Sequence, residues 1–133
     1  MTPAVLRSGF GRKGNLYRED KFTCQVASLL QQFCQPDWRY SHLPFGERRD
    51  PKTARKLKLM GVTPGWPDFM LVGPGKVCFL ELKSKTGQPS AAQSAIAGHL
   101  MACGCGYGLT SSFDDVVSML QAWGVIGPEV HVQ

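Results

Sequence analysis

The chain has 133 residues, of which 43% are apolar, and a formal net charge of +5 at pH 7. This length fits one domain with a proper hydrophobic core, and the composition excludes a low-complexity chain. No apolar run approaches the roughly 20 residues that cross a bilayer, so we expect no membrane partner. The start of the chain lacks the apolar core of a signal peptide, and an odd number of cysteines fits a reducing compartment. We therefore expect a cytoplasmic protein.

Hydrophobic periodicity, turn residues and capping signals predict mixed α and β structure. In chain order the predicted elements are a helix over 19–34, a short strand over 38–43, a helix over 51–60, a hairpin over 67–83, a helix from about 90 to 103, a strand over 106–110 and a helix from about 112 to 124. Residues 1–18 are expected to form a flexible basic arm, because Gly and Ser accompany their Arg and Lys residues. Residues 127–133 are expected to form a C-terminal tail.

Positive charge is concentrated just before the predicted hairpin. Between positions 48 and 58 the only acid is Asp50, and the basic residues are Arg48, Arg49, Lys52, Arg55, Lys56 and Lys58. Such a cluster is typical of a surface that meets phosphate groups, although a solvated helix face is the alternative. We expect these side chains, together with Lys85, to contact the phosphates of a nucleic-acid backbone without reading its sequence.

The predicted hairpin brings three charged side chains to one end. Two apolar runs flank a Gly-Pro-Gly turn, which indicates antiparallel strands. If Val72 faces Val77 across a four-residue loop, Asp68 lies opposite Glu81, and Lys83 projects on the same side as Glu81. Opposed carboxylates are destabilising unless something compensates them, and a Mg²⁺ or Mn²⁺ ion with oxygen ligands would do so. Ordinary strand-end carboxylates and a solvated lysine are the alternative interpretation.

These residues resemble the PD-(D/E)xK nuclease signature, in which Pro67-Asp68 is followed after a short hairpin by Glu81-Leu82-Lys83. The wider context is similar to the VRR-NUC family of that superfamily, from about residue 19 to residue 126. The flanking matches are Lys58-Leu59-Met60-Gly61-Val62, Gly65-Trp66, Gly87, Gln93 and Leu120-Gln121-Ala122-Trp123-Gly124. The resemblance implies a restriction-endonuclease-like mixed sheet flanked by helices, in a single nuclease domain.

The resemblance also implies roles for individual residues. Asp68 and Glu81 would bind the metal, with the backbone carbonyl of Leu82 as a further oxygen, and Lys83 would orient the nucleophile and offset transition-state charge. Glu19 is the candidate for an additional acid from the first helix, and Asp20 or Gln25 could take that place instead.

Three other polar or aromatic positions have two interpretations. Gln93 would belong to the neighbourhood of the active site, but Ser90 and Gln93 also form an S-x-x-Q capping box. His42 would pack or hydrogen-bond, or contact phosphate. Trp66 would lie in the core or stack on a base. The loop after His42 carries Phe45 and Glu47 where the family tends to have a polar, glycine-bearing loop.

The expected function is a metal-dependent endonuclease that hydrolyses DNA phosphodiester bonds. By resemblance it would be structure-selective and would act in DNA repair as a homodimeric Holliday-junction resolvase, since two symmetric cuts need two sites related by a two-fold axis. A non-catalytic DNA-binding module and a nuclease acting on RNA are the alternatives.

Overall fold

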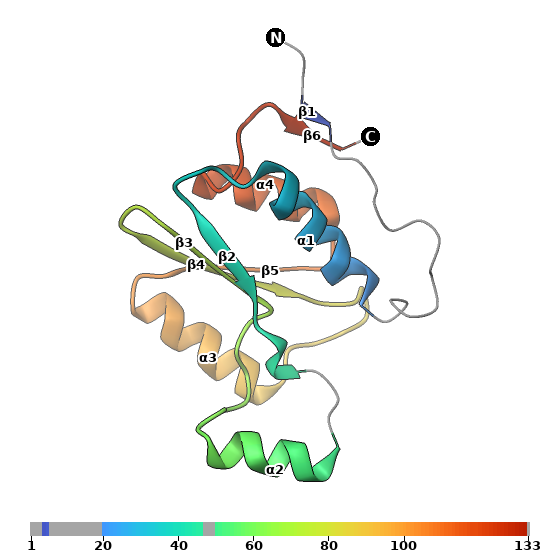
Figure 1. Cartoon of the computed structure of the whole chain (residues 1–133), viewed down its shortest axis with the longest axis vertical. Helices are drawn as coiled ribbons and strands as arrows, with labels where there is room; N and C mark the ends of the chain where they lie inside the picture. Colours follow the sequence, from blue (N-terminus) through green and yellow to red (C-terminus); the bar gives the residue numbers. More distant parts are fainter. Residues whose placement is uncertain (1–3, 6–19, 47–49, 133) are drawn as a thin grey trace.

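The structure is a computed structural model that describes residues 4–5, 20–46 and 50–132 (Figure 1). Its main elements are α1 (Lys21–Phe33), β2 (Arg39–His42), the 3₁₀ turn η1 (Pro44–Gly46), α2 (Pro51–Leu59), β3 (Phe69–Gly73), β4 (Lys76–Leu82), α3 (Ala91–Ala102), β5 (Gly106–Thr110) and α4 (Phe113–Trp123). The helices and strands predicted from the sequence are therefore present, with bounds that differ by a few residues at most.

A four-stranded sheet of order β2-β3-β4-β5 forms the centre of the fold. β2, β3 and β4 are antiparallel neighbours, whereas β5 runs parallel to β4 because α3 crosses over between them. Val72 pairs with Val77, as the sequence predicts. The ladder continues through Gly73 and Lys76, so the turn is shorter than the expected four-residue loop. Its second residue, Gly75, has a φ of 67°, which glycine adopts without strain.

α1 and α4 cover one face of the sheet, and α3 covers the other (Figure 1). The main core lies under α1 and α4, where the apolar stripes of both helices meet the inward residues of the strands. Its fully buried members include Leu29, Phe69, Leu80 and Leu120. Since strand side chains alternate between faces, Phe79 and Glu81 project to the face of α3. Phe79 is buried there, and α3 contributes Ala97 and Leu100 to this second layer.

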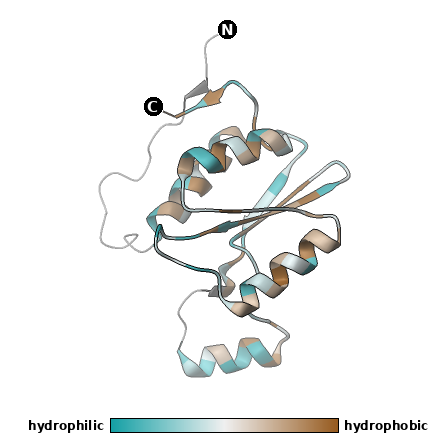
Figure 2. Cartoon of the chain, turned by 180° about the vertical axis from the view of Figure 1, so that it is seen from behind, coloured by the Kyte–Doolittle hydropathy of each residue, from teal (hydrophilic) through white to brown (hydrophobic). Residues whose placement is uncertain are grey.

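α2 lies apart from both layers (Figure 1). None of its residues is buried, and Figure 2 shows that it is largely hydrophilic. The side chain of Asp50 caps its N-terminus by accepting hydrogen bonds from the backbone N–H of Thr53, at 2.8 Å, and from the Thr53 hydroxyl, at 2.9 Å. α2 is therefore a capped, basic helix that is exposed to solvent on nearly all sides.

A separate two-stranded sheet joins the two ends of the chain. β1 (Ala4–Val5) and β6 (Val130–His131) are parallel. Val130 is buried and belongs to the main core, so the segment after residue 126 also contributes to packing. The arm over 1–18, the domain over 19–126 and the tail over 127–133 stay predictions. In the described part of the chain, no helix is long and apolar enough to cross a membrane.

Candidate active site

Asp68 joins the ends of three strands. Its carboxylate Oδ2 accepts a 2.7 Å hydrogen bond from the backbone N–H of Leu82, across the hairpin. Its carbonyl accepts a 2.6 Å bond from the N–H of Leu43 and lies 2.8 Å from Nδ1 of His42. Because a carbonyl only accepts, Nδ1 of His42 carries the proton in this contact. These contacts hold the backbone and side chain of Asp68 in place, and His42 has the packing and hydrogen-bonding role that the sequence favours.

Glu81 is the most unusual acid of the described residues. The pairing of Phe69 with Leu80, continued by one residue, places Glu81 opposite Asp68. Glu81 is only 3% exposed, and its Oε2 has no hydrogen-bond partner among the described residues. Burial, with the nearby Asp68 carboxyl as the second cause, raises the pKa of Glu81 to about 8 against the opposing effect of Lys83. A buried carboxylate of this kind requires a positive charge beside it to stay ionised at neutral pH.

The donor set fits a hard divalent cation. Mg²⁺ binds carboxylate oxygens and is commonly held by one or two of them, with water and phosphate oxygens as the other ligands. Asp68 and Glu81 supply such a pair, and the free Oε2 is the atom that a cation would satisfy. Among the described residues, no three His, Cys, Asp or Glu side chains form a cluster that could hold a metal. Further ligands would therefore be the carbonyl of Leu82, water or substrate. Glu19 lies outside the described residues.

Lys83 is held in position by α3. Its Nζ donates a 2.6 Å hydrogen bond to Oε1 of Gln93. The same oxygen accepts a 2.9 Å bond from the backbone N–H of Ser90, whose hydroxyl in turn accepts a 3.1 Å bond from the N–H of Gln93. The two interpretations of Gln93 are therefore compatible, because one amide oxygen both closes the capping box of α3 and contacts Lys83.

Two aromatic residues lie beside Phe79, which projects to the same face of the sheet as Glu81. Trp66 is half-buried, packs on Phe79 with ring centroids 6.2 Å apart, and donates a 3.0 Å hydrogen bond to the hydroxyl of Thr63. Tyr107 is next to Phe79 on the neighbouring strand. Burial, followed by the charges of Glu81 and Asp68, raises the pKa of the Tyr107 phenol. Tyr107 could not be identified from the sequence, because its place depends on a parallel pairing whose register has no local signal.

The predicted backbone-contacting residues divide into two groups. Lys52, Arg55 and Lys58 are exposed on α2. Lys85 lies with Lys83 beside an open cleft of about 320 Å³, between the loop that follows β4 and the end of β5. Arg48 and Arg49 lie outside the described residues. The structure therefore places Lys85 in the same cleft as Lys83, while the α2 residues belong to a separate projecting element.

No protein-family model matches this sequence, and no curated protein matches it. Among solved structures, the chain is similar to one described as a "VRR_NUC domain protein", with a TM-score of 0.51 and 22% sequence identity over 71% of each chain. This likeness concerns the fold. The predicted fold class, a single-domain mixed sheet flanked by helices, is confirmed, and the chain has the fold of a VRR_NUC domain protein.

Proposed function

We propose that this protein is a metal-dependent endonuclease that hydrolyses DNA phosphodiester bonds. The observation that carries the proposal is the buried carboxylate of Glu81, which has an unpartnered oxygen and lies opposite Asp68, with Lys83 two residues further along the chain. The fold shared with a VRR_NUC domain protein supports a nuclease. A pure binding protein would gain nothing from two opposed acids at a surface that has to meet phosphates.

Asp68 and Glu81 would hold Mg²⁺ or Mn²⁺, with the Leu82 carbonyl and Glu19 as further candidate ligands. The bound cation would supply Lewis-acid polarisation of the scissile phosphate and a water of lowered pKa. Asp68 contributes a fixed geometry, because its carboxylate is already bonded to the N–H of Leu82. Glu81 contributes a negative charge in a site that excludes water on one side, which strengthens its attraction for a cation.

Lys83 would orient the attacking water and offset the negative charge that develops on the phosphate. Its contact with Gln93 restricts the ammonium group to one position on the α3 face. In this role Lys83 and Gln93 act together: the lysine touches the reacting atoms, and the glutamine positions the lysine. Lys85 lies further along the same cleft, where it would contact the neighbouring backbone phosphate.

We further propose that the enzyme is structure-selective and acts on branched DNA, in the manner of a homodimeric Holliday-junction resolvase. The basic helix α2 supports contact with phosphates, and so do the two lysines, Lys83 and Lys85, that line the same cleft. Two copies related by a two-fold axis would present two cleavage sites to the two symmetric strands of a junction.

The test is cleavage of labelled four-way junction, flap, nicked and linear duplex DNA in Mg²⁺, Mn²⁺ or EDTA. We expect metal-dependent cutting that Asp68→Asn abolishes. Asp37→Asn is the matched control, since Asp37 is an exposed acid next to the start of β2, and we expect it to cut like the wild type. No cutting by the wild type with any metal on any substrate would overturn the proposal.

The two alternatives give distinct results in the same assay. A non-catalytic DNA-binding module would bind the substrates tightly without cutting them in any metal. A ribonuclease would cut RNA strands of the same sequence and leave DNA intact. We favour DNA, because the family that the carboxylates and the lysine resemble includes replication-repair nucleases.

A further inference from the structure

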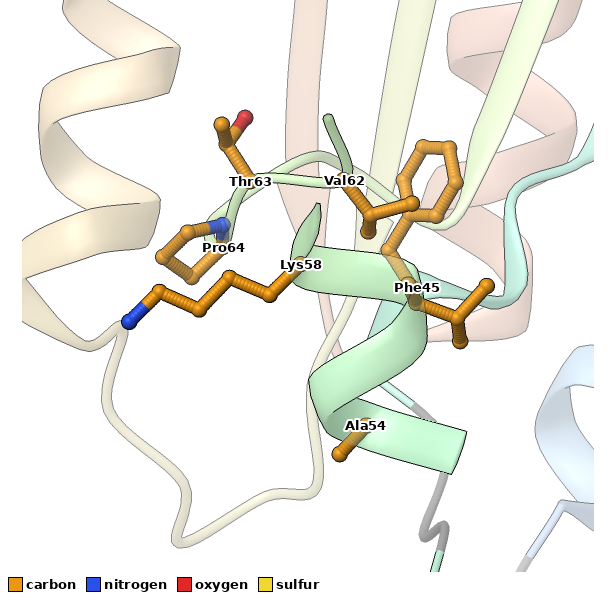
Figure 3. Close-up of a pocket in the computed structure, with 7 residues that line it drawn as sticks. Phe45, Ala54, Lys58, Val62, Thr63 and Pro64 are labelled. Carbon is orange, nitrogen blue, oxygen red and sulfur yellow. The ribbon is translucent and has the colours of Figure 1, made fainter. Parts of the chain in front are cut away.

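A pocket separate from the carboxylates lies under the inner face of α2 (Figure 3). Its volume is about 570 Å³, within the range of pockets that take small organic groups. η1 contributes Phe45, α2 contributes Ala54, Leu57 and Lys58, and the segment over 62–64 forms the remaining wall. The proposed function uses none of these side chains except Lys58, so the pocket needs its own explanation.

The wall over 62–64 is fixed to the rest of the protein. The N–H of Val62 donates a 3.0 Å hydrogen bond to the carbonyl of Leu57 at the end of α2, and the hydroxyl of Thr63 accepts the bond from Trp66. Gly65, which follows, has a φ of 99° and packs so closely on α3 that a Cβ there would collide with the carbonyl of Ala92. Hydrogen bonds and close packing therefore hold this wall in place, and the pocket opens to solvent between the wall and α2.

The lining is apolar and carries one aromatic ring and one cation. Phe45 is 39% exposed, and Figure 3 shows its ring beside Val62. Lys58 extends past Pro64, and within the described residues no ion pair holds it. A flat apolar group that bears a negative charge fits this combination, since the ring can stack on it and the ammonium group can meet the charge. A nucleotide has both parts, the base and the phosphate.

The pocket lies close to the proposed cleavage site along the chain. Thr63 and Asp68 are five positions apart in the chain, and five positions span at most about 18 Å. A base held in the pocket therefore belongs to a nucleotide near the scissile phosphate. On the outer face of α2, Lys52, Arg55 and Lys56 are exposed and available to the backbone on the other side of the helix.

We infer that this pocket receives an unpaired nucleobase of the DNA, which stacks on Phe45 while Lys58 contacts its phosphate. The inference rests on the proposed function in taking DNA as the substrate. It deepens that function by naming an unpaired base as the feature of the DNA that is selected. Extruding a base from a paired stack costs free energy, whereas a base at a branch, bulge or flap is already free. The pocket therefore favours DNA with an unpaired base beside the cut over a continuous duplex.

The experiment measures binding without cleavage. The Asp68→Asn protein in EDTA is titrated with a duplex that carries one unpaired 2-aminopurine, and with the same duplex fully paired, by fluorescence anisotropy. We expect tighter binding to the unpaired form, and Phe45→Ala reduces that preference about fivefold or more. Val72→Ala is the matched control, because Val72 is also 39% exposed but lies in the hairpin near its turn.

A second variant separates loss of stacking from loss of folding. Phe45→Trp keeps a flat ring, and we expect it to retain the preference that Phe45→Ala loses. Lys58→Ala weakens binding to both duplexes, and Lys76→Ala, an exposed lysine beside the hairpin turn, leaves both unchanged. An unchanged preference in Phe45→Ala, with the circular dichroism of the wild type, would overturn the inference.

The outcomes for the pocket and for the nuclease are independent. If the unpaired base is preferred but the wild type cuts nothing, the pocket stands and the proposed function fails. If the wild type cuts and Phe45→Ala retains the preference for the unpaired base, the nuclease stands and the pocket fails.

Discussion

The ammonium group of Lys83 donates a 2.6 Å hydrogen bond to the side-chain oxygen of Gln93, which also accepts the N–H of Ser90 at the start of α3. The residue that follows β4 and the N-cap residue of α3 thus share one acceptor atom. The orientation of Lys83 therefore depends on the first turn of a helix that follows it in the chain, and changes to that turn test the role of the lysine.

Ser90→Ala and Gln93→Ala separate the cap from the lysine contact. Ser90→Ala removes a cap hydroxyl, and we expect a loss of about 1 kcal/mol in the free energy of unfolding with cleavage nearly unchanged. Gln93→Ala removes the oxygen that accepts hydrogen bonds from both the N–H of Ser90 and Lys83. We expect it to lower kcat about tenfold with DNA affinity retained. Thermal denaturation and single-turnover cleavage measure the two effects. Equal kcat values for the two variants would contradict the positioning role of Gln93.

Lys83→Ala tests the lysine itself. Since Lys83 would act on charge that develops during the reaction, we expect DNA binding close to that of the wild type and a loss of about 100-fold or more in cleavage rate. Binding is measured in EDTA, and cleavage in Mg²⁺. Lys85→Ala is the comparison, and we expect it to weaken binding with little change in the rate at saturating DNA. Unimpaired cutting by Lys83→Ala would remove its assigned role.

Glu81 makes the metal-free protein less stable as the pH rises. Its pKa is about 8 in the folded protein, above its ordinary value of 4.5, so the folded state holds the proton more tightly than the unfolded state does. The contribution of Glu81 to the free energy of unfolding is therefore fully present below about pH 4.5. It is lost progressively up to about pH 8, and the loss is a few kcal/mol at most. Denaturation in urea with EDTA measures this slope. Glu81→Gln should flatten it and be the more stable protein at pH 8.

Divalent cations should reverse this loss. At pH 8, Mg²⁺ or Mn²⁺ bound to the ionised pair stabilises the folded state by mass action, so we expect the melting temperature to rise with cation concentration. Neither Asp68→Asn nor Glu81→Gln should show the same rise, because each removes one of the two carboxylates. Asp37→Asn provides the baseline for nonspecific ionic effects. An equal rise in all four proteins would place the cation elsewhere.

Gly61 and Gly65 form a matched pair for testing the wall of the pocket. Both have a φ of 99°, but a Cβ at Gly61 meets nothing within 4 Å, whereas a Cβ at Gly65 would collide with the backbone of Ala92. Gly61→Ala should cost only the strain of the left-handed backbone, about 1 kcal/mol. Gly65→Ala should cost clearly more and also lower cleavage, because it displaces the α3 turn that holds Gln93. Similar unfolding free energies for the two variants would contradict the close packing.

The register of the hairpin could be predicted from the sequence, because local signals determine it. Alternating apolar residues on both sides of the Pro74-Gly75 turn leave one pairing that keeps Phe69, Leu71 and Leu80 in the core, and that pairing opposes Asp68 and Glu81. The capping box of Ser90 and Gln93 could also be predicted, from the S-x-x-Q spacing. These features depend on residues a few positions apart.

Features that depend on distant segments could not be predicted. The resemblance places Gln93 near the active site, but its contact with Lys83 could not be predicted, since that contact requires the packing of α3 on the sheet. The neighbourhood of Tyr107 and the pairing of β1 with β6 depend on the meeting of segments that are far apart in the chain. The exposure of α2 was one of two interpretations of its charges, because the sequence pattern does not show whether another element packs on Leu57.

The three strand ends that meet at Asp68 have a consequence for folding order. His42 and Leu43 reach its carbonyl from 26 and 25 positions upstream, and the N–H of Leu82 reaches its carboxylate from 14 positions downstream. Lys83 then requires Gln93, which is synthesised later still. A nascent chain that ends just after Lys83 has both carboxylates and the lysine, but it lacks Gln93, the partner of the lysine. The geometry of the site is therefore completed only after most of the polypeptide has been made and the domain is assembled.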